Sequence, residues 1–290
     1  MKVLVFGGAG FIGSYVVDEL LSRGFDVTVF DQCPARHLHG RGGMVLGDIL
    51  DAAAVDAAVA EHDLVYHFAG AADLDEAVDA PHETISLNVM GTLNILEACR
   101  KSPVQRFVYA SSAYVFSRKG AFYATSKKCA EVIIEQYADR YSLPFTILRY
   151  GSVYGERADQ NNRIHKFLHE ALTTGRITFS GDGSEERDYI HGRDAATLSV
   201  DILDDAFRDK HVLLAGADRT DMRRLLCLID EMLGGGLEID LQNQGMPGHY
   251  VRTPYSFTPS RGLKLTSNPS VDLGQGLIEC MEAMEGEGNQ

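Results

Sequence analysis

The stretch KVLVFGGAGFIGSYVVDELLSRGFDVTVFD, residues 2–31, decides the fold of this chain. Its first five residues are largely apolar and predict a buried strand, and apolar residues then recur at helical spacing through residues 11–23. Gly24 ends this helix, and residues 26–30 predict a second strand that runs into Asp31. A strand, a glycine turn, a helix and a strand ending on an acid form one βαβ unit, which binds a dinucleotide.

The glycines of this unit have separate roles. Gly7 permits the tight turn, Gly10 lets the backbone approach a pyrophosphate, and Gly13 lets the helix pack close to the strand. The first helical N–H groups, at Phe11 and Ile12, point at the phosphates with the positive end of the helix dipole behind them. A glycine turn that binds nothing is the alternative, and the flanking strand, helix and acid weigh against it.

Asp31 indicates which dinucleotide is bound. A carboxylate at the end of the second strand accepts hydrogen bonds from the adenosine ribose hydroxyls and repels a 2′-phosphate. We therefore expect NAD rather than NADP as the cofactor.

The bulk composition limits the kinds of protein that this chain can be. Its 290 residues suffice for one large domain or two fused ones, and 45% of them are apolar. A net charge of −14 argues against nucleic acid and anionic membranes as partners. No apolar run reaches membrane-spanning length, and the five scattered cysteines form no CxxC pair and suit a reducing compartment. We expect a cytoplasmic protein.

Strands and helices alternate along the first 150 residues. Further strands are expected at 42–48, 64–70, 106–112 and 145–149, and helices at 51–61, 81–101 and 123–141. This alternation predicts an α/β fold, a Rossmann doubly wound parallel sheet with helices on both faces. Ligands of such a sheet bind beyond the carboxyl ends of the strands. The residues expected at these ends are Asp31, Asp48, Gly70, Ser112 and Arg149.

The pattern changes after about residue 150. Helices are expected at 164–173, 192–204 and 222–233, a strand at 211–215, and loops up to a last helix at 273–282. We expect a nucleotide-binding domain over 1–155, to which 191–215 returns, and a smaller C-terminal substrate-binding lobe made of 156–190 and 216–290. A cleft between the two is the usual place for a ligand.

A tyrosine and a lysine four residues apart, Tyr123 and Lys127, lie on one face of an expected helix. A free tyrosine is a poor base at neutral pH, but a nearby ammonium stabilises the phenolate and lowers the phenol pKa. Such a phenol can take the proton of a sugar hydroxyl while hydride leaves the same carbon. Ser112, with Ser111 beside it at the end of the adjoining strand, could hydrogen-bond the same oxygen. A surface pair is the alternative, and the dinucleotide fingerprint weighs against it.

Together these features resemble the extended short-chain dehydrogenases/reductases, in particular the nucleotide-sugar epimerases and dehydratases. The resemblance covers nearly the whole chain. Beyond the glycine turn, Asp31 and the Tyr123–Lys127 pair, it comprises Gly47-Asp48-Ile49, His67-Phe68-Ala69-Gly70, Asn88 with Gly91-Thr92-Leu93-Asn94, Ser111-Ser112, Leu148-Arg149-Tyr150, Val153-Tyr154-Gly155, Gly181-Asp182-Gly183 and Arg187-Asp188-Tyr189-Ile190.

The resemblance implies roles for residues of this chain. Tyr123 would be the catalytic base, Lys127 would orient the nicotinamide ribose, and Ser112 would assist. The residues expected to contact NAD are Gly7, Gly10, Phe11, Ile12, Gly13, Asp31, Asp48, Ile49, Phe68, Ala69, Gly70, Asn88, Tyr123, Lys127 and Tyr150. The residues expected to contact the substrate are Ser112, Ser152, Arg187 and Arg252, with Arg187 on the diphosphate of a nucleotide sugar. A solvated role for Arg252 stays open. We also expect a homodimer.

Three departures from the family pattern stand out. Ser112 and Tyr123 are only eleven residues apart, where relatives usually carry a longer loop that borders the substrate. Ser152 replaces the usual asparagine after the sixth strand. The 4,6-dehydratases carry an acid pair directly after the hydroxyl that matches Ser112, and here those positions are Ala113 and Tyr114.

The function that these residues favour is NAD-dependent epimerisation of a nucleotide-diphosphate sugar, at carbon 4, through a 4-keto sugar. A dehydratase or a 4-ketoreductase of the same family is the alternative within enzymes, and a non-catalytic NAD-binding regulatory protein is the alternative outside them. His165 and His169 share a helical face, but no HExxH arrangement accompanies them, so no metal site is expected.

Overall fold

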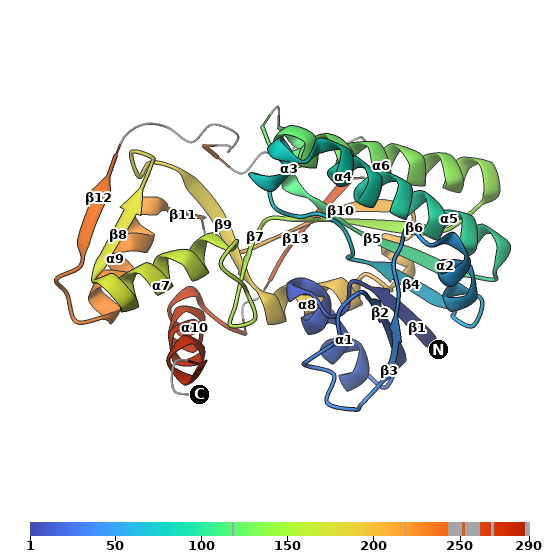
Figure 1. Ribbon diagram of the computed structural model, residues 1–290, viewed down its shortest axis with the longest axis horizontal. Coiled ribbons are helices and arrows are strands. Elements are labelled where there is room, and N and C mark those ends of the chain that lie inside the picture. Colours follow the sequence, from blue (N-terminus) through green and yellow to red (C-terminus); the bar gives the residue numbers. More distant parts are fainter. Residues whose placement is uncertain (118, 218, 243–250, 253–261, 268–269, 288–290) are drawn as a thin grey trace.

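An eight-stranded parallel sheet forms the centre of the larger lobe (Figure 1). The computed structural model describes residues 1–117, 119–217, 219–242, 251–252, 262–267 and 270–287. The strand order is β13-β10-β6-β5-β4-β1-β2-β3, and each neighbouring pair runs parallel. The bounds are β1 Lys2–Phe6, β2 Asp26–Asp31, β3 Gly43–Leu46, β4 Leu64–His67, β5 Arg106–Ser112, β6 Phe145–Tyr150, β10 Lys210–Ala215 and β13 Gly262–Thr266. The expected doubly wound sheet is confirmed.

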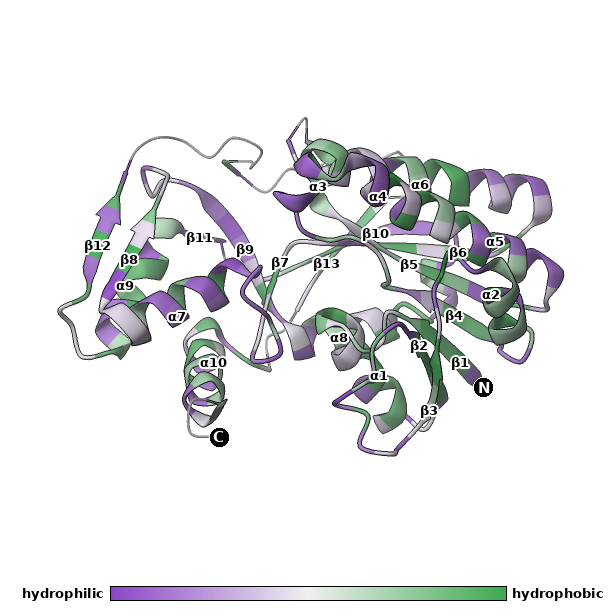
Figure 2. Ribbon diagram, viewed as in Figure 1, coloured by the Kyte–Doolittle hydropathy of each residue, from purple (hydrophilic) through white to green (hydrophobic). Residues whose placement is uncertain are grey.

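Two apolar layers hold helices against the two faces of this sheet. In β1, Val3 and Val5 face one layer and Leu4 and Phe6 face the other, as the strand period requires. The first layer joins α1 (Phe11–Ser22) and α8 (Gly192–Asp201), and the second joins α2 (Ala52–Val59), α5 (Thr92–Lys101) and α6 (Ala121–Tyr141). Figure 2 shows hydrophobic residues along the central strands. Because both faces of the large sheet are buried under helices, the ends of its strands, where a ligand would bind, are held in place.

The helix that the sequence predicts over residues 81–101 is confirmed, but it contains a π-helical segment in its middle. After the single turn α3 (Glu76–Asp79), the chain forms α4 (Pro81–Ile85), a π-helical segment (Ser86–Gly91) and then α5. A π turn inserts one residue, which apolar periodicity does not reveal, and such turns occur often at functional sites. This one carries Asn88, whose side-chain amide donates to the Ala71 carbonyl and to Ser126 Oγ, both at 2.9 Å.

In the described residues, the smaller lobe contains two short sheets and three helices. Its three-stranded sheet has the order β11-β9-β7 and its two-stranded sheet pairs β12 with β8. The bounds are β7 Ser152–Tyr154, β8 Arg176–Phe179, β9 Glu186–His191, β11 Arg219–Asp221 and β12 Glu238–Leu241, with α7 Arg163–Thr174, α9 Met222–Met232 and α10 Leu273–Glu287. The helices pack with these strands around a separate apolar core that includes Phe167, Leu225 and Leu277.

The structure corrects the expectation of loops between residues 234 and 272. β12 lies in this region, and β13 pairs in parallel with β10 at the edge of the large sheet. We expected 216–290 to lie wholly in the smaller lobe, and β13 instead returns to the nucleotide-binding half. Both strands alternate polar and apolar residues, but over only four and five residues, which is too short for the pattern to distinguish a strand from a loop. Within the described part of the chain, no helix has the length and apolar character needed to cross a bilayer.

Candidate active site

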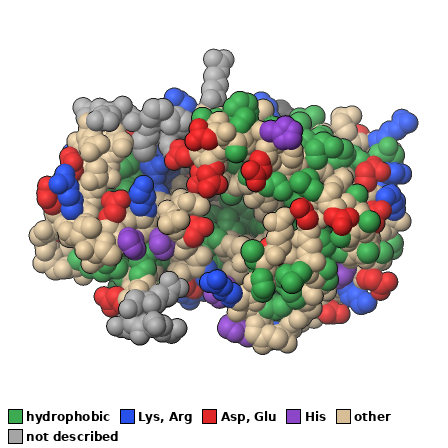
Figure 3. Space-filling view, viewed as in Figure 1, with side chains coloured by type: hydrophobic (Ala, Val, Ile, Leu, Met, Phe, Trp, Pro, Cys, Tyr) green, Lys and Arg blue, Asp and Glu red, His purple; other side chains and the backbone are tan. Residues whose placement is uncertain are grey.

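Two adjoining cavities of about 450 and about 400 Å³ open beyond the carboxyl ends of the large sheet's strands. Gly7, Gly10, Phe68 and Gly70 line both of them, so the two form one continuous cleft. Figure 3 shows a hollow at the centre of one face, with apolar side chains in its depth and acidic side chains gathered above it. The first cavity also receives residues of the smaller lobe, and the second extends to the end of β2.

The glycine turn is packed too closely to accept a side chain. Gly7 has a φ of +79°, and a Cβ there would lie 2.4 Å from the Ala69 nitrogen. A Cβ at Gly13 would lie 2.2 Å from the Gly7 carbonyl oxygen, so α1 begins directly against the turn. Gly10, Phe11 and Ile12 then line the first cavity. This backbone cradle fits the pyrophosphate of a dinucleotide.

Asp31 reaches the far end of the cleft. Its carboxylate accepts hydrogen bonds from the backbone N–H groups of Ala9, at 3.0 Å, and Cys33, at 3.1 Å. Asp31 lines the second cavity together with Ile49 and Ala69, which matches the expected adenosine site. Asp48 is not among the residues that line either cavity, and its carboxylate accepts from the Leu50 N–H at 2.9 Å.

Tyr123 and Lys127 both line the first cavity from one face of α6. The Lys127 Nζ lies 6.0 Å from the centre of the Tyr123 ring and 5.0 Å from the centre of the Tyr109 ring, and it donates to the Ala110 carbonyl at 2.9 Å. Burial lowers the pKa of Lys127 to about 8, against an opposing effect of Glu131. The ammonium therefore persists at neutral pH and can stabilise a Tyr123 phenolate.

The two serines at the end of β5 differ in their partners. Ser112 lines the first cavity, and its Oγ accepts from the Tyr114 N–H at 3.3 Å. Ser111 also lines that cavity, but its hydroxyl donates to Glu131 at 2.6 Å. This contact holds Ser111 away from a proton-transfer role, and only Ser112 presents its hydroxyl as expected.

Of two further residues of the cofactor prediction, Tyr150 lines the first cavity, and Asn88 lines neither cavity but lies behind Gly70, which lines both. The Asn88 Oδ1 is buried and has no hydrogen-bond partner among the described residues, and a Cβ at Gly70 would lie 2.3 Å from it. An unsatisfied buried acceptor beside a small-residue turn fits a ligand that donates there. Tyr150 lines the first cavity with its ring, while its hydroxyl pairs with Ser199 Oγ at 2.6 Å.

Two arginines line the end of the first cavity that the smaller lobe supplies. Arg187, from β9, is 5% exposed and is held by the carbonyls of Glu186, at 2.8 Å, and Val251, at 3.1 Å. Arg163, at the first position of α7, was missed in the sequence. Burial, and to a smaller extent the charge of Arg187, lowers the pKa of Arg163, and both cations line the same cavity. Asn162 caps the start of α7, and this capping residue is the local sequence signal that could have placed Arg163 at the first turn of a helix.

Of the two remaining residues expected to contact the substrate, one lines the first cavity and the other lines neither cavity. Ser152 lines the first cavity next to Arg163 and Arg187. Arg252 is not among the lining residues of either cavity, and its 73% exposed side chain pairs with Glu186 at 3.2 Å.

The positions that would carry an acid pair in a dehydratase hold no acid in this chain. Ala113 is buried, and Tyr114 lines the first cavity with its ring 6.4 Å from that of Tyr123, in an edge-to-face arrangement. A short 3₁₀ turn, Ala113–Phe116, leads almost directly into α6. A second phenol therefore lies beside that of Tyr123 in the first cavity.

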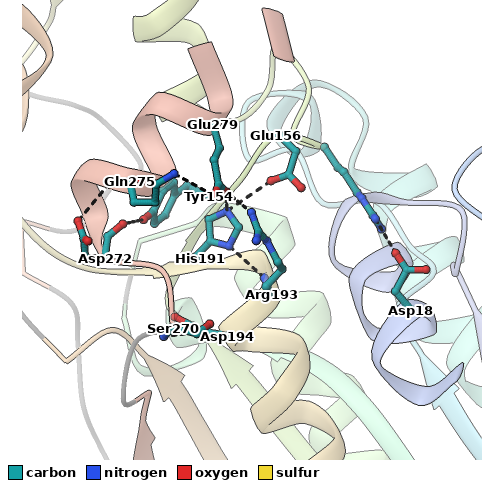
Figure 4. A network of polar contacts seen from close by, with 11 residues as sticks. Asp18, Tyr154, Glu156, His191, Arg193, Asp194, Ser270, Asp272, Gln275 and Glu279 are labelled. Atoms are coloured by element: carbon teal, nitrogen blue, oxygen red, sulfur yellow. Dashed lines mark hydrogen bonds and ion pairs between the residues drawn. The ribbon is translucent and has the colours of Figure 1, made fainter. Parts of the chain in front are cut away.

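A polar network joins the smaller lobe to α1 and α8 (Figure 4). His191 ends β9, and its Nε2 lies 3.4 Å from Glu156 and 3.9 Å from Glu279. These three residues could hold a metal ion by distance alone. However, the His191 Nδ1 accepts the Arg193 N–H, so the neutral ring carries its proton on Nε2, facing the carboxylates. Arg193 also pairs with Glu279. Both features suit a structural junction and oppose a metal ion.

The comparisons with known proteins identify the family. The family model described as "NAD dependent epimerase/dehydratase family" matches residues 3–216. The chain belongs to this family. Its NAD-dependent chemistry agrees with the Asp31 side of the cleft and with the glycine cradle.

The relatives within the NAD-dependent epimerase/dehydratase family include more than one activity. The UDP-glucose 4-epimerase of Mycolicibacterium smegmatis is 29% identical, over 97% of this chain and 98% of that protein. The dTDP-glucose 4,6-dehydratase of an Actinoplanes species is 30% identical, over 97% of both. The structure of Thermus thermophilus UDP-glucose 4-epimerase in complex with NAD is 27% identical and has a TM-score of 0.83, over 99% of both chains.

Proposed function

We propose that this protein is an NAD-dependent nucleotide-sugar epimerase that inverts carbon 4 of the sugar through a 4-keto sugar. The observation that carries the proposal is the placement of Tyr123, Lys127 and Ser112 in a cavity that is continuous with the glycine cradle. The same cavity ends on two arginines. A cofactor site, a base and an anion site thus line one cleft, which is the combination that this reaction of a nucleotide sugar requires.

In this mechanism the Tyr123 phenol takes the proton of the sugar 4-hydroxyl and later returns it. The buried Lys127 ammonium stabilises the phenolate, and the Ser112 hydroxyl holds the same oxygen. The chemistry that NAD supplies when bound is reversible uptake of the carbon-4 hydride. The glycine cradle, Asp31 and Asn88 would hold it, because their packing leaves a backbone surface and an unused acceptor there.

The diphosphate of the substrate would lie between Arg187 and Arg163. Two planar guanidinium groups that line the same end of the cavity match two adjacent phosphates, whose oxygens can accept bidentate hydrogen bonds. This pair also supplies the local positive charge that an acidic protein needs to bind a nucleotide sugar. Ser152 would contact the sugar or the diphosphate beside them.

Epimerisation is favoured over dehydration by Ala113 and Tyr114. Elimination of water across carbons 5 and 6 needs a base at carbon 5 and an acid for the departing hydroxyl, and the resembled dehydratases draw both from an acid pair. Inversion at carbon 4 needs neither, since the chemistry takes place at one carbon. The dehydratase relative of similar identity keeps the alternative open to test.

Turnover of a panel of nucleotide sugars in deuterated water tests the proposal. We expect an inverted sugar without carbon-bound deuterium and without consumption of added NADH. Deuterium at carbon 5 or 6 of a 4-keto-6-deoxy product would show a dehydratase, and stoichiometric oxidation of added NADH would show a reductase. Absence of turnover with tight NAD binding would favour a non-catalytic NAD-binding protein.

We further propose that the protein is a homodimer of the cytoplasm. Large apolar side chains are exposed on α3, on the π-helical segment and on α6, which pack against one another. They are Val78, Met90, Phe122 and Val132. All five cysteines are free, as suits a reducing compartment. Light scattering should give twice the 31.8 kDa chain mass, and Phe122→Glu should shift the protein toward monomer.

A further inference from the structure

A polar stripe continues from the catalytic pair along α6. Tyr123, Lys127, Glu131 and Glu135 follow one another at intervals of four residues and therefore lie on one face of the helix. Lys127 and Glu131 are each 5% exposed. A buried carboxylate one helical turn from a catalytic ammonium is costly unless other groups hold it.

Two strands of the large sheet contact Glu131, and a third contacts its arginine partner. Arg149 of β6 forms two hydrogen bonds with its carboxylate, at 2.9 and 2.6 Å, and Ser111 of β5 donates a third at 2.6 Å. Arg149 also donates to the His211 Nδ1 of β10 at 2.6 Å. The His211 Nε2 in turn lies 2.9 Å from the Glu135 carboxylate. The carboxylate of Glu131 is thereby fixed beneath the floor of the cleft.

The groups around Lys127 differ in charge. Tyr109 of β5 is buried, which raises its pKa well above the usual value and keeps it neutral. His67 of β4 has its pKa lowered to about 3 by burial and by Lys127, so it is also neutral. Tyr123 and Glu131 face Lys127 from its own helix, and Glu131 is the carboxylate that raises the Lys127 pKa. Among these groups Glu131 is the carboxylate, and it lies one helical turn from Lys127.

We propose that Glu131 is a positioning residue for catalysis, which keeps the Lys127 ammonium protonated and in place while Arg149 and Ser111 keep Glu131 ionised. The proposal assigns Ser111 to this network rather than to the substrate. It rests on the proposed role of Lys127, but the charge of Lys127 can be measured without any turnover. The alternative is that Glu131 and Arg149 form a structural ion pair that only holds α6 against β6.

The test is the titration of Lys127 in the full-length protein, followed by NMR of lysine labelled at the ε-carbon, without and with saturating NAD. The Lys127 resonance is the one that Lys127→Arg removes. In Glu131→Gln we expect the Lys127 midpoint to fall by about one pH unit or more, because a charge about one helical turn away is lost. The alkaline limb of kcat/KM should move down by the same amount.

Glu135→Gln is the matched control, since it removes a carboxylate from the next turn of the same stripe. It should move the Lys127 midpoint by less than about 0.3 unit, because the distance to Lys127 is twice as large. Glu131→Asp keeps the charge and should restore most of the midpoint. These two outcomes separate the charge of Glu131 from a general disturbance of α6.

A double variant covers the case in which Glu131→Gln alone does not fold. Glu131→Gln with Arg149→Met leaves no uncompensated buried charge, and such neutral replacements of buried ion pairs are often tolerated. We expect a lowered Lys127 midpoint here too, by a smaller amount. An unchanged midpoint in the double variant, with only the melting temperature altered, would overturn the proposal and leave Glu131 a structural residue. Absence of epimerase turnover with a shifted midpoint would instead count against the proposed function alone.

Discussion

The cofactor half of the cleft is built from backbone, whereas the substrate half is built from charged and hydroxyl side chains. In the cofactor half, Gly7 and Gly13 let two chain segments approach within van der Waals contact. In the substrate half, Tyr123, Lys127 and Arg187 reach one cavity from α6 and β9, which belong to different lobes. A backbone site is specified by a local motif, and a side-chain site depends on how the lobes pack.

This difference implies that the two halves can be disabled separately. Loss of the Tyr123 hydroxyl or of an anion-binding arginine should leave NAD binding intact, and crowding of the glycine turn should weaken NAD binding without touching the substrate groups. The expected effects are largest where a proton is transferred and smallest where one cofactor is distinguished from another.

Tyr123→Phe should give the largest loss. Only the acid–base hydroxyl disappears, so kcat should fall by about 10²–10⁴-fold while NAD affinity and melting temperature stay near those of the unaltered protein. Steady-state kinetics, NAD titration and thermal unfolding measure the three quantities. Unaltered turnover on the true substrate would remove Tyr123 from the mechanism.

Arg187→Ala should weaken binding of the nucleotide sugar by about 2–4 kcal/mol, or roughly 30- to 1,000-fold, because a buried charge-assisted contact is lost. Arg163→Ala should act in the same direction, and both should weaken UDP more than UMP if they bracket the diphosphate. Arg252→Ala is the matched control on the surface. A collapsed melting temperature with unaltered affinity would mean that Arg187 serves only to hold the lobe.

Gly13→Ala should impair the cofactor half of the cleft. The added methyl meets the Gly7 carbonyl and displaces the turn, which should cost about 1–3 kcal/mol and weaken NAD binding by roughly 5- to 150-fold. Gly286→Ala, where a Cβ meets nothing within 4 Å, is the control and should bind NAD normally. Calorimetric titration of both variants with NAD measures their affinities. Full NAD affinity in Gly13→Ala would show that the cradle is more adaptable than its packing indicates.

Asp31 is the exception, a side chain in the backbone half, and its effect should be the smallest. The unaltered protein should bind NAD more tightly than NADP, and Asp31→Asn should narrow that preference by roughly 10-fold, because the repulsion of the 2′-phosphate is removed. Titrations with both cofactors measure the ratio. Equal affinities in the unaltered protein would refute the role of Asp31.

The cofactor half could be predicted from the sequence because its determinants are adjacent in the chain. Gly7, Gly13 and Asp31 lie in one βαβ unit, and each sits where its motif places it. The substrate half was predicted in part. Tyr123 and Lys127 share a helix, but the contribution of Arg163 depends on how α7 packs in the smaller lobe, and the partner of Ser111 is a carboxylate twenty residues away.

The same reasoning explains where the sequence-based predictions differ from the structure. The π turn at Asn88 changes the helical count by one residue without altering the composition. β13 joins the large sheet through a partner strand about fifty residues earlier in the chain, and no local pattern encodes that pairing. Arg252 has the positive charge that a phosphate contact needs, but it is exposed and pairs with Glu186. Whether an arginine faces the cleft or the solvent depends on packing, which the sequence pattern does not reveal.

The most direct test of the account follows the hydride itself. Single turnover with a nucleotide sugar deuterated at carbon 4 should produce a transient absorbance of reduced nicotinamide, and the inverted product should carry the deuterium at carbon 4. This result would show that the hydride leaves and returns at one carbon within the cleft. Inverted product without transient reduction, or with hydrogen at carbon 4 in place of the deuterium, would contradict the account.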